Sequence, residues 1–271
     1  LGIPRNFLNV VEMADGDFVW LVGDDDLLMP YALKTLLALI EKHQNVDFFY
    51  VNSFHLKSEY VFSFPQPFDI TTLPKNMVPF SSWVTDGEMK FMDLINPKIS
   101  FDFLGGMFLS VFRRRNWIQH LNALDTTAVS DPRLFSHFDN TFPHIKRFSA
   151  EFAGSWAYFT TKPVSVCLSG AREWAPMYQL VHSVCLVEAL GEYSKNGLGY
   201  VNFWLCKNYA LNNFMPDLVS MAIRREHSGY AYINPFKLIL ENCLYPNFYL
   251  SFFNFFIRKG KLLLSRALQR A

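Results

Sequence analysis

The fold is decided by residues 17–26, which read Asp-Phe-Val-Trp-Leu-Val-Gly-Asp-Asp-Asp. The apolar run at residues 18–22 contains two valines and a tryptophan, which is typical of a strand buried on both faces, as in a parallel sheet. The run ends abruptly at Gly23 and three adjacent aspartates. We therefore predict a short buried strand whose carboxyl end carries an acidic turn.

A helix and a second strand follow the acidic turn. Residues 31–43 carry leucine and isoleucine at helical spacing, and Pro30 suits the first turn of a helix. Residues 47–54 (Asp-Phe-Phe-Tyr-Val-Asn-Ser-Phe) are typical of the next strand. Strand, acidic turn, helix and strand in this order predict an α/β fold.

The rest of the chain predicts more of the same sheet and then a helical part. We expect strands at residues 101–112 and 157–168, helices at 116–124 and 142–152, and mainly helical structure from residue 175, clearest at residues 178–193. This pattern divides the chain into a catalytic α/β domain at residues 1–174 and a helical C-terminal region at residues 175–271.

Composition and charge exclude several classes of protein. The 271 residues include 25 basic and 24 acidic side chains, so no global field attracts nucleic acid, and we expect no such partner. The 4 cysteines form no C-x-x-C pair, which disfavours a zinc site or a disulfide framework and favours a cytosolic protein. We find neither a signal-peptide pattern nor a run of ~20 apolar residues. We expect a cytoplasmic protein, with contact at the inner face of the cell membrane left open.

The three neighbouring carboxylates, Asp24, Asp25 and Asp26, need compensation if they are buried. Like charges at this spacing raise the pKa of at least one carboxyl unless a metal ion or a basic group neutralises them. Mg²⁺ and Mn²⁺ bind one or two carboxylates together with substrate phosphates, and ligands of open α/β sheets bind at the carboxyl ends of strands. The alternative is that the acids cap the following helix and remain solvated. The hydrophobic strand and the glycine before the acids favour a metal or donor site.

The same segment resembles a known enzyme family, the family-2-type glycosyltransferases, which have the GT-A fold and are largely inverting. The similar residues are Asn6, residues 14–26 (Ala-Asp-Gly-Asp-Phe-Val-Trp-Leu-Val-Gly-Asp-Asp-Asp), Pro30 and residues 32–33. The aspartates match the D-x-D position of that family. The resemblance implies that Asp24 lies near the nucleoside and sugar of the donor. It also implies that Asp26, with Asp24, binds the metal ion that bridges the donor diphosphate, and that Asp25 lies beside them.

A second stretch strengthens the likeness. Residues 105–114 (Gly-Gly-Met-Phe-Leu-Ser-Val-Phe-Arg-Arg), followed by Trp117, resemble the acceptor-side strand of the family, in particular of bacterial O-antigen and capsule sugar transferases related to abequosyltransferase. The resemblance implies that Gly105 and Gly106 lie at the acceptor. It is clearest from about residue 6 to residue 174.

The chain departs from the family in two places. Only 23 residues precede Asp24, where members carry roughly three further strands and two helices. We therefore expect a GT-A-like mixed sheet that is flanked by helices and lacks its first strands, with a helical C-terminal appendage. The Glu-Asp pair that many members use as the catalytic base falls here on Phe142-Pro143-His144. His144 titrates near neutrality and is one candidate base, and Asp139 is the other; alternatively, His144 makes only a hydrogen bond at the helix start.

Arg172 and Trp174 follow the last predicted strand. In the family, an arginine or tryptophan near this point lies on a loop that covers the donor phosphates, and the planar guanidinium of Arg172 suits a diphosphate. The resemblance therefore implies donor contacts for both residues. The alternative is a surface arginine beside a packed tryptophan.

Residues 252–266 combine aromatic and basic side chains. This combination is typical of an interfacial helix on an anionic leaflet. The alternative is a helix folded onto the catalytic domain, and Gly260 weakens the prediction of one continuous helix.

Together, these features predict a glycosyltransferase of surface polysaccharide biosynthesis. With Mg²⁺ or Mn²⁺ it would transfer a hexose or deoxyhexose from a nucleoside-diphosphate sugar to a hydroxyl of a glycan or lipid-linked acceptor, with inversion. Two alternatives remain open from the sequence. One is a nucleotidyltransferase on a related sheet, and the other is a non-catalytic remnant that binds a glycan or a partner subunit.

Overall fold

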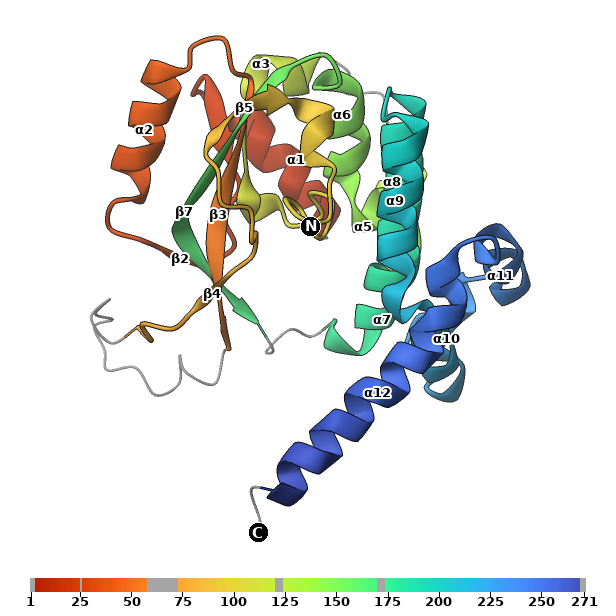
Figure 1. Cartoon of the computed structure of the whole chain (residues 1–271). Helices are drawn as coiled ribbons and strands as arrows, with labels where there is room; N and C mark the ends of the chain where they lie inside the picture. The colour runs from red at the N-terminus through yellow and green to blue at the C-terminus, as the bar shows by residue number, and fades with distance from the viewer. Residues whose placement is uncertain (1–2, 25, 58–72, 120–123, 170–173, 269–271) are drawn as a thin grey trace.

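The computed structural model describes residues 3–24, 26–57, 73–119, 124–169 and 174–268, with side chains up to residue 260. These residues form an α/β fold whose mixed, curled sheet is flanked by helices (Figure 1). The strands are β1 (Phe18–Trp20), β2 (Leu27–Leu28), β3 (Phe48–Lys57), β4 (Val78–Pro79), β5 (Gly87–Lys90), β6 (Ser110–Arg113) and β7 (Trp156–Ser169).

The sheet is built around two long neighbouring strands. The strand order is β1-β6-β3-β7-β2, while β4 pairs with β3 and β5 pairs with β7. The long strands β3 and β7 run parallel, and the other described pairs are antiparallel. Residues alternate perfectly in β3: Phe48 and Tyr50 face one core cluster, while Phe49 and Val51 face the other. Both faces of β3 are therefore buried, as its continuous apolar sequence requires.

Helices cover both faces of this sheet. The helices are α1 (Ile3–Met13), α2 (Ala32–Lys42), α3 (Arg114–Ile118), α4 (Thr126–Ser130), α5 (Phe138–Thr141), α6 (Pro143–Glu151), α7 (Tyr178–Leu180), α8 (Leu186–Lys195), α9 (Tyr200–Ala210), α10 (Phe214–Ile223), α11 (Pro235–Asn242) and α12 (Pro246–Leu268). A π-helical turn, Val181–Cys185, joins α7 to α8. Ala32 and Leu36 of α2 pack on the face that carries Phe49, whereas α6 and α8 pack on the face that carries Phe48.

Aromatic rings fill the larger core. The Phe48 ring meets the rings of Phe148 in α6 and of Phe152, directly after α6, edge-on at centroid distances of 5.1 and 5.4 Å. Phe112 stacks on Trp117 at 5.0 Å. Such contacts account for the high aromatic content of the sequence, because each buried ring removes a large apolar area from water. Leu186, Ala189, Leu190 and Tyr193 of α8 belong to the same cluster, so the core continues across the predicted boundary at residue 174.

Most of the predicted elements are confirmed. The predicted helix at residues 31–43 is α2, the strand at 47–54 is β3, the helix at 142–152 is α6, the strand at 157–168 is β7, and the helical C-terminal part begins near residue 175. The helix α12 runs through Gly260 without a break. Among the described residues, no helix is both long enough and apolar enough to span a bilayer.

Two strand predictions need correction. The predicted strand at residues 18–22 exists as β1, but it pairs antiparallel with β6, and Phe18 and Trp20 are only half-buried. The prediction of a strand throughout residues 101–112 was wrong, because only Ser110–Arg113 is extended, and Met107–Leu109 forms a 3₁₀ turn. Local side-chain bonds described below hold the first part of this segment in a tight turn instead.

Two helix predictions also differ from the structure. The helix predicted at residues 116–124 is the shorter α3, and residues 120–123 lie outside the described part. The helix α1 was not predicted. It buries Val11 in the main core, and Arg114 donates hydrogen bonds to the carbonyl oxygens of Val11 and Glu12 in its last turn, both at 3.1 Å.

Candidate functional site

The acidic turn connects β1 to β2. Asp24 is exposed and Asp26 is half-buried, while Asp25 lies outside the described residues. The Asp26 amide donates to the Gly23 carbonyl at 3.2 Å, which closes the turn. The capping alternative does not hold, because β2 intervenes and the N-cap residue of α2 is Tyr31. Asp24 is solvated, as that alternative also expected, but the described acids of the turn do not cap α2.

The carboxylates of Asp24 and Asp26 suit a divalent ion held jointly with a substrate. Hard cations such as Mg²⁺ need only one or two protein carboxylates when phosphate oxygens and water supply the remaining ligands. Within the described ranges, which omit Asp25, no group of three or more potential ligands gathers into a complete metal site. Metal binding by Asp24 and Asp26 therefore stays a prediction.

The acidic turn is tied to the loop that contains the glycine pair. The indole nitrogen of Trp20, at the end of β1, donates to the Phe108 carbonyl at 2.8 Å. Trp20 also lies opposite Val111 in the pairing of β1 with β6. The strand that leads into the acids and the segment after Gly105 and Gly106 are therefore held side by side.

The glycine pair itself is packed against Asp102. The Gly106 amide donates to Asp102 Oδ2 at 2.8 Å, and a Cβ atom on Gly106 would lie 2.7 Å from that oxygen. A Cβ atom on Gly105 would lie 3.1 Å from the Asp102 carbonyl oxygen. Because these glycines have no side chains, Asp102 can approach them closely. Contact of the glycine pair with an acceptor stays a prediction.

The backbone between Asp102 and the glycines is strained. Phe103 and Leu104 have φ angles of 49° and 67°, in the left-handed region that bulky side chains rarely adopt. Such residues cost of order 1–3 kcal/mol each and concentrate at functional sites. The Ser100 hydroxyl donates to Asp102 Oδ1 at 3.1 Å and accepts from the Leu104 amide at 2.7 Å, which fixes the turn.

The Asp102 carboxyl has an unusual environment for an acid. Burial raises its pKa, although the hydrogen bonds from Ser100 and Gly106 act in the opposite direction. Burial, and then the charge of Asp102, also raises the pKa of Tyr50 and Tyr193, whose hydroxyls lie in the core. Sequence reasoning missed Asp102. The available signal was an acid inside an apolar run, four residues before Gly106.

His144 lies inside the core, at the start of α6. It is 1% exposed, and its Nε2 lies 3.0 Å from the Leu104 carbonyl oxygen. Burial lowers its pKa to about 4, so the ring is neutral near pH 7 and donates this hydrogen bond. The contact joins α6 to the strained loop and matches the structural alternative for this residue. Catalysis by His144 stays a prediction, and it requires an acceptor hydroxyl to reach the ring.

Asp139, the rival base, is also engaged within the protein. It is 2% exposed, its Oδ2 accepts from the Asp125 amide at 2.8 Å, and its Oδ1 lies 2.6 Å from Lys146 Nζ. The carboxylate therefore joins α5 to α6 and to the N-cap of α4. A base role for Asp139 stays a prediction as well, and it would need this ion pair to open.

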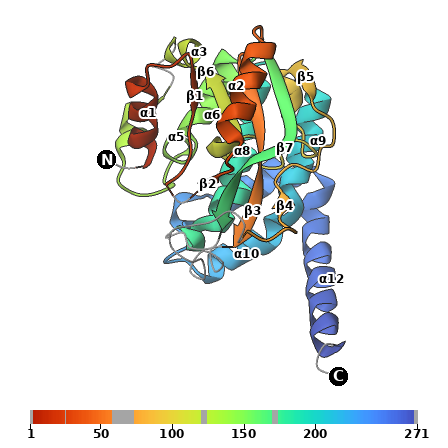
Figure 2. The same cartoon turned by 90° about the vertical axis from the view of Figure 1, so that its left-hand side faces the viewer.

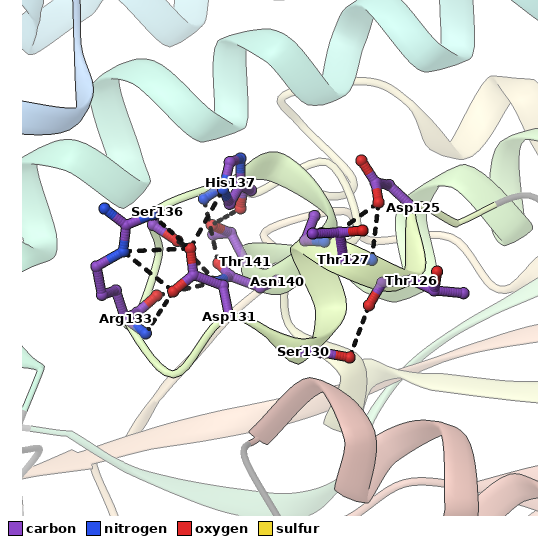
Figure 3. A network of polar contacts seen from close by, with 11 residues as sticks. Asp125, Thr126, Thr127, Ser130, Asp131, Arg133, Ser136, His137, Asn140 and Thr141 are labelled. Atoms are coloured by element: carbon purple, nitrogen blue, oxygen red, sulfur yellow. Dashed lines mark hydrogen bonds and ion pairs between the residues drawn. The ribbon is translucent and has the colours of Figure 1, made fainter.

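A polar network surrounds the two short helices before α6 (Figure 3). Asp125 caps α4 by accepting from the Thr127 and Ala128 amides. Asp131 pairs with Arg133 at 2.6 Å, and the hydrogen bonds from Arg133 hold the pKa of Asp131 far below its usual range. A cavity of about 580 Å³ is lined by Thr126, Thr127, Ser130, Asp131, Arg133 and His137. Because Arg133 is already paired, the network stabilises this surface rather than offering a free cation.

Of the two predicted donor-loop residues, the structure describes only Trp174. Arg172 is outside the described residues. Trp174 is half-buried, meets Phe135 edge-on at 5.5 Å and stacks on Tyr178 at 6.4 Å. Packing of Trp174 agrees with the alternative of a packed tryptophan, and contact of either residue with a donor stays a prediction.

Comparison with protein-family models and with curated sequences gives no match that could indicate a function. No protein-family model matches the chain, and no curated protein matches its sequence significantly. The functional reading therefore rests on the motif residues and on their arrangement.

Proposed function

We propose that this chain is the catalytic part of a family-2-type glycosyltransferase with a GT-A-like fold, acting in surface polysaccharide biosynthesis. It transfers a sugar from a nucleoside-diphosphate sugar to a hydroxyl of a glycan or a lipid-linked oligosaccharide. One observation carries the proposal. The acidic turn after β1 is joined through the Trp20–Phe108 hydrogen bond to a strained loop with a half-buried acid, Asp102.

The donor diphosphate belongs at the acidic turn. Asp24 and Asp26 are the residues that would hold a Mg²⁺ or Mn²⁺ ion there. When bound, the ion neutralises charge on the departing diphosphate. The predicted roles of Asp25, Arg172 and Trp174 in donor binding belong to the same proposal.

The catalytic base belongs on the acceptor side of the anomeric carbon, opposite the departing diphosphate. Burial raises the pKa of Asp102, and its carboxyl oxygens accept hydrogen bonds from two neutral donors, the Ser100 hydroxyl and the Gly106 amide. His144 is enclosed in the core, and Asp139 is paired with a lysine. We therefore favour Asp102 over the two bases predicted from sequence.

The proposed reaction is a single displacement. The base removes the proton of the acceptor hydroxyl, whose oxygen bonds to the anomeric carbon as the bond from that carbon to the diphosphate oxygen breaks. The nucleoside diphosphate leaves with the bonding electron pair, and attack from the opposite face inverts the anomeric centre.

Metal-dependent nucleotide binding tests the donor half of the proposal. Isothermal titration of the chain with UDP, GDP and dTDP should show binding of at least one nucleotide in the presence of Mn²⁺ and none after chelation. Asp26→Ala should abolish this binding, whereas Asp17→Ala, a neighbouring acid before β1, should leave it intact. Binding that is indifferent to Mn²⁺ and to Asp26→Ala would contradict the proposal.

Turnover with nucleotide sugars tests the reaction. The product released should be a nucleoside diphosphate, and release of pyrophosphate would indicate a nucleotidyltransferase instead. Asp102→Asn should lower kcat by roughly 100-fold or more while nucleotide affinity is retained. His144→Gln and Asp139→Asn serve as comparisons, and a loss of kcat confined to one of them would move the base to that residue.

A further inference from the structure

The first part of α12 packs on the rest of the protein, whereas its C-terminal part does not. Its first turns pack on α9, α10 and the turn between them, with Ser251 fully buried. The Asn247 side chain donates to the Asn208 carbonyl at 2.7 Å, and Arg258 donates to Asn213 Oδ1 at 2.5 Å. Beyond these contacts, both views show α12 projecting away from the rest of the protein (Figures 1 and 2).

One face of α12 exposes large apolar side chains. Tyr249, Phe253 and Phe256 are 63%, 63% and 66% exposed, and Leu250 and Ile257 are 47% and 40% exposed. Positions 249, 253 and 256 follow helical spacing, with 250 and 257 beside them, so the five side chains form one stripe. We call these five residues the α12 stripe. The stripe lies on the anchored part of α12, opposite the side that buries Ser251. Neighbouring exposed apolar side chains of this kind are typical of a surface that docks on something apolar.

The charge of the same segment is strongly one-sided. Residues 246–271 contain Arg258, Lys259, Lys261, Arg266 and Arg270 and no acidic residue. The preceding 245 residues carry 20 basic and 24 acidic side chains. The cationic character of the chain is therefore concentrated on the helix that carries the exposed aromatic rings.

We propose that α12 docks on the anionic surface of a lipid bilayer, with the α12 stripe in the headgroup region and the positive charge of residues 246–271 attracted to lipid phosphates. An exposed aromatic stripe on a helix whose sequence is rich in arginine and lysine and free of acids is the combination that binds such an interface. A second copy fits less well, because pairing two α12 helices brings four cations and no acid against another four cations. The inference does not depend on the glycosyltransferase proposal, although it would bring that site to lipid-linked acceptors.

Vesicle sedimentation tests the proposal with the whole chain. We expect binding to vesicles of phosphatidylcholine mixed with phosphatidylglycerol, weaker binding to phosphatidylcholine alone, and weakening by salt. Phe253→Ser with Phe256→Ser should lower the partition coefficient by about tenfold or more. Lys259→Ser should lower it by about fivefold, because one basic residue near an anionic surface contributes about that factor.

The matched control lies on α2. Leu33 and Leu37 are 61% and 60% exposed, close to the values for Phe253 and Phe256, and α2 covers the opposite face of the sheet from α8. Leu33→Ser with Leu37→Ser should therefore leave vesicle binding unchanged. Circular dichroism and nucleotide titration of each variant show that folding and the donor site are intact.

Three results would overturn the proposal. The first is a folded wild-type chain that does not sediment with anionic vesicles. The second is equal loss of binding in the α2 control. The third is a concentration-dependent dimer in sedimentation velocity that the α12 variant abolishes, with vesicle binding unchanged, which would assign the stripe to a second copy.

Discussion

At the scale of single residues, the acidic turn could be predicted from the sequence, whereas the carboxyl group beside the glycine pair became apparent only in the structure. Asp24, Asp25 and Asp26 stand out because three like charges follow a hydrophobic strand directly. Asp102 does not stand out, because its environment is created by a backbone turn that folds it onto Gly106. Burial and strain of this kind depend on tertiary packing, which no local pattern reveals.

The hydrogen bond of His144 predicts a pH dependence of stability. Its pKa is about 4 in the folded protein, below the usual value near 6.5. Folded stability is therefore lost as pH falls below about 6.5, because the unfolded chain gains a proton there that the folded chain does not. Between pH 7 and pH 5 the loss from this residue is about 2 kcal/mol.

Urea unfolding at both pH values measures this effect. His144→Gln keeps a donor for the Leu104 carbonyl but cannot titrate, so its stability should fall less between pH 7 and pH 5 than that of the wild type. The other histidines contribute equally to both proteins and cancel in the difference. An identical pH dependence for the two proteins would show that the ring is not enclosed as described.

The contact between Gly106 and Asp102 predicts a sensitive position. A methyl group on Gly106 would approach Asp102 Oδ2 to 2.7 Å, so Gly106→Ala must displace a carboxylate that is hydrogen-bonded in a strained turn. We expect a loss of about 1–3 kcal/mol in the free energy of unfolding. Gly154→Ala is the control, because nothing lies within 4 Å of a Cβ atom there. Equal stability of the two variants in thermal unfolding would contradict the packing of this loop.

At the scale of elements, the pattern of hydrophobic residues predicted the helices and strands that local sequence determines. The strand β3 and the helix α2 were predictable because one begins with the apolar and aromatic run Phe48 to Val51 and the other repeats leucine at helical spacing. The segment at residues 101–109 was mistaken for a strand because apolar residues also line a buried turn. The direction of strand pairing could not be predicted either. The composition of β1 is typical of a parallel strand, but β1 pairs antiparallel with β6.

The continuity of α12 predicts the effect of a substitution at Gly260. This glycine is exposed, lies inside the helix and has nothing within 4 Å of a Cβ atom. Gly260→Ala should therefore stabilise the helix locally by about 1 kcal/mol, because alanine restricts the unfolded backbone and favours helix. Hydrogen exchange should report slower exchange of the amides around residue 260, with no change in α8. Unchanged exchange would mean that α12 is not helical through this point in solution.

At the scale of the whole molecule, the core argues against treating the predicted catalytic and helical regions as independent units. Tyr193 of α8 is fully buried and lies at 6.3 Å, between ring centroids, from Phe91 on the sheet side. Cys206 of α9 donates to the Ile95 carbonyl at 3.2 Å. Residues on both sides of position 174 thus fill one apolar cluster, and removing the C-terminal part would expose the face of the sheet that α8 covers.

This continuity predicts a single cooperative unfolding transition. Urea curves followed by tryptophan fluorescence and by far-ultraviolet circular dichroism should coincide, because four of the six tryptophans precede residue 174 while helices of the C-terminal region contribute much of the dichroism. Leu190→Ala, in α8, should lower the stability of the whole protein by about 2–5 kcal/mol and shift both curves together. Separate transitions, or a shift in the dichroism curve alone, would show that the helical region folds independently and that α8 contributes little to holding the acidic turn and the strained loop in place.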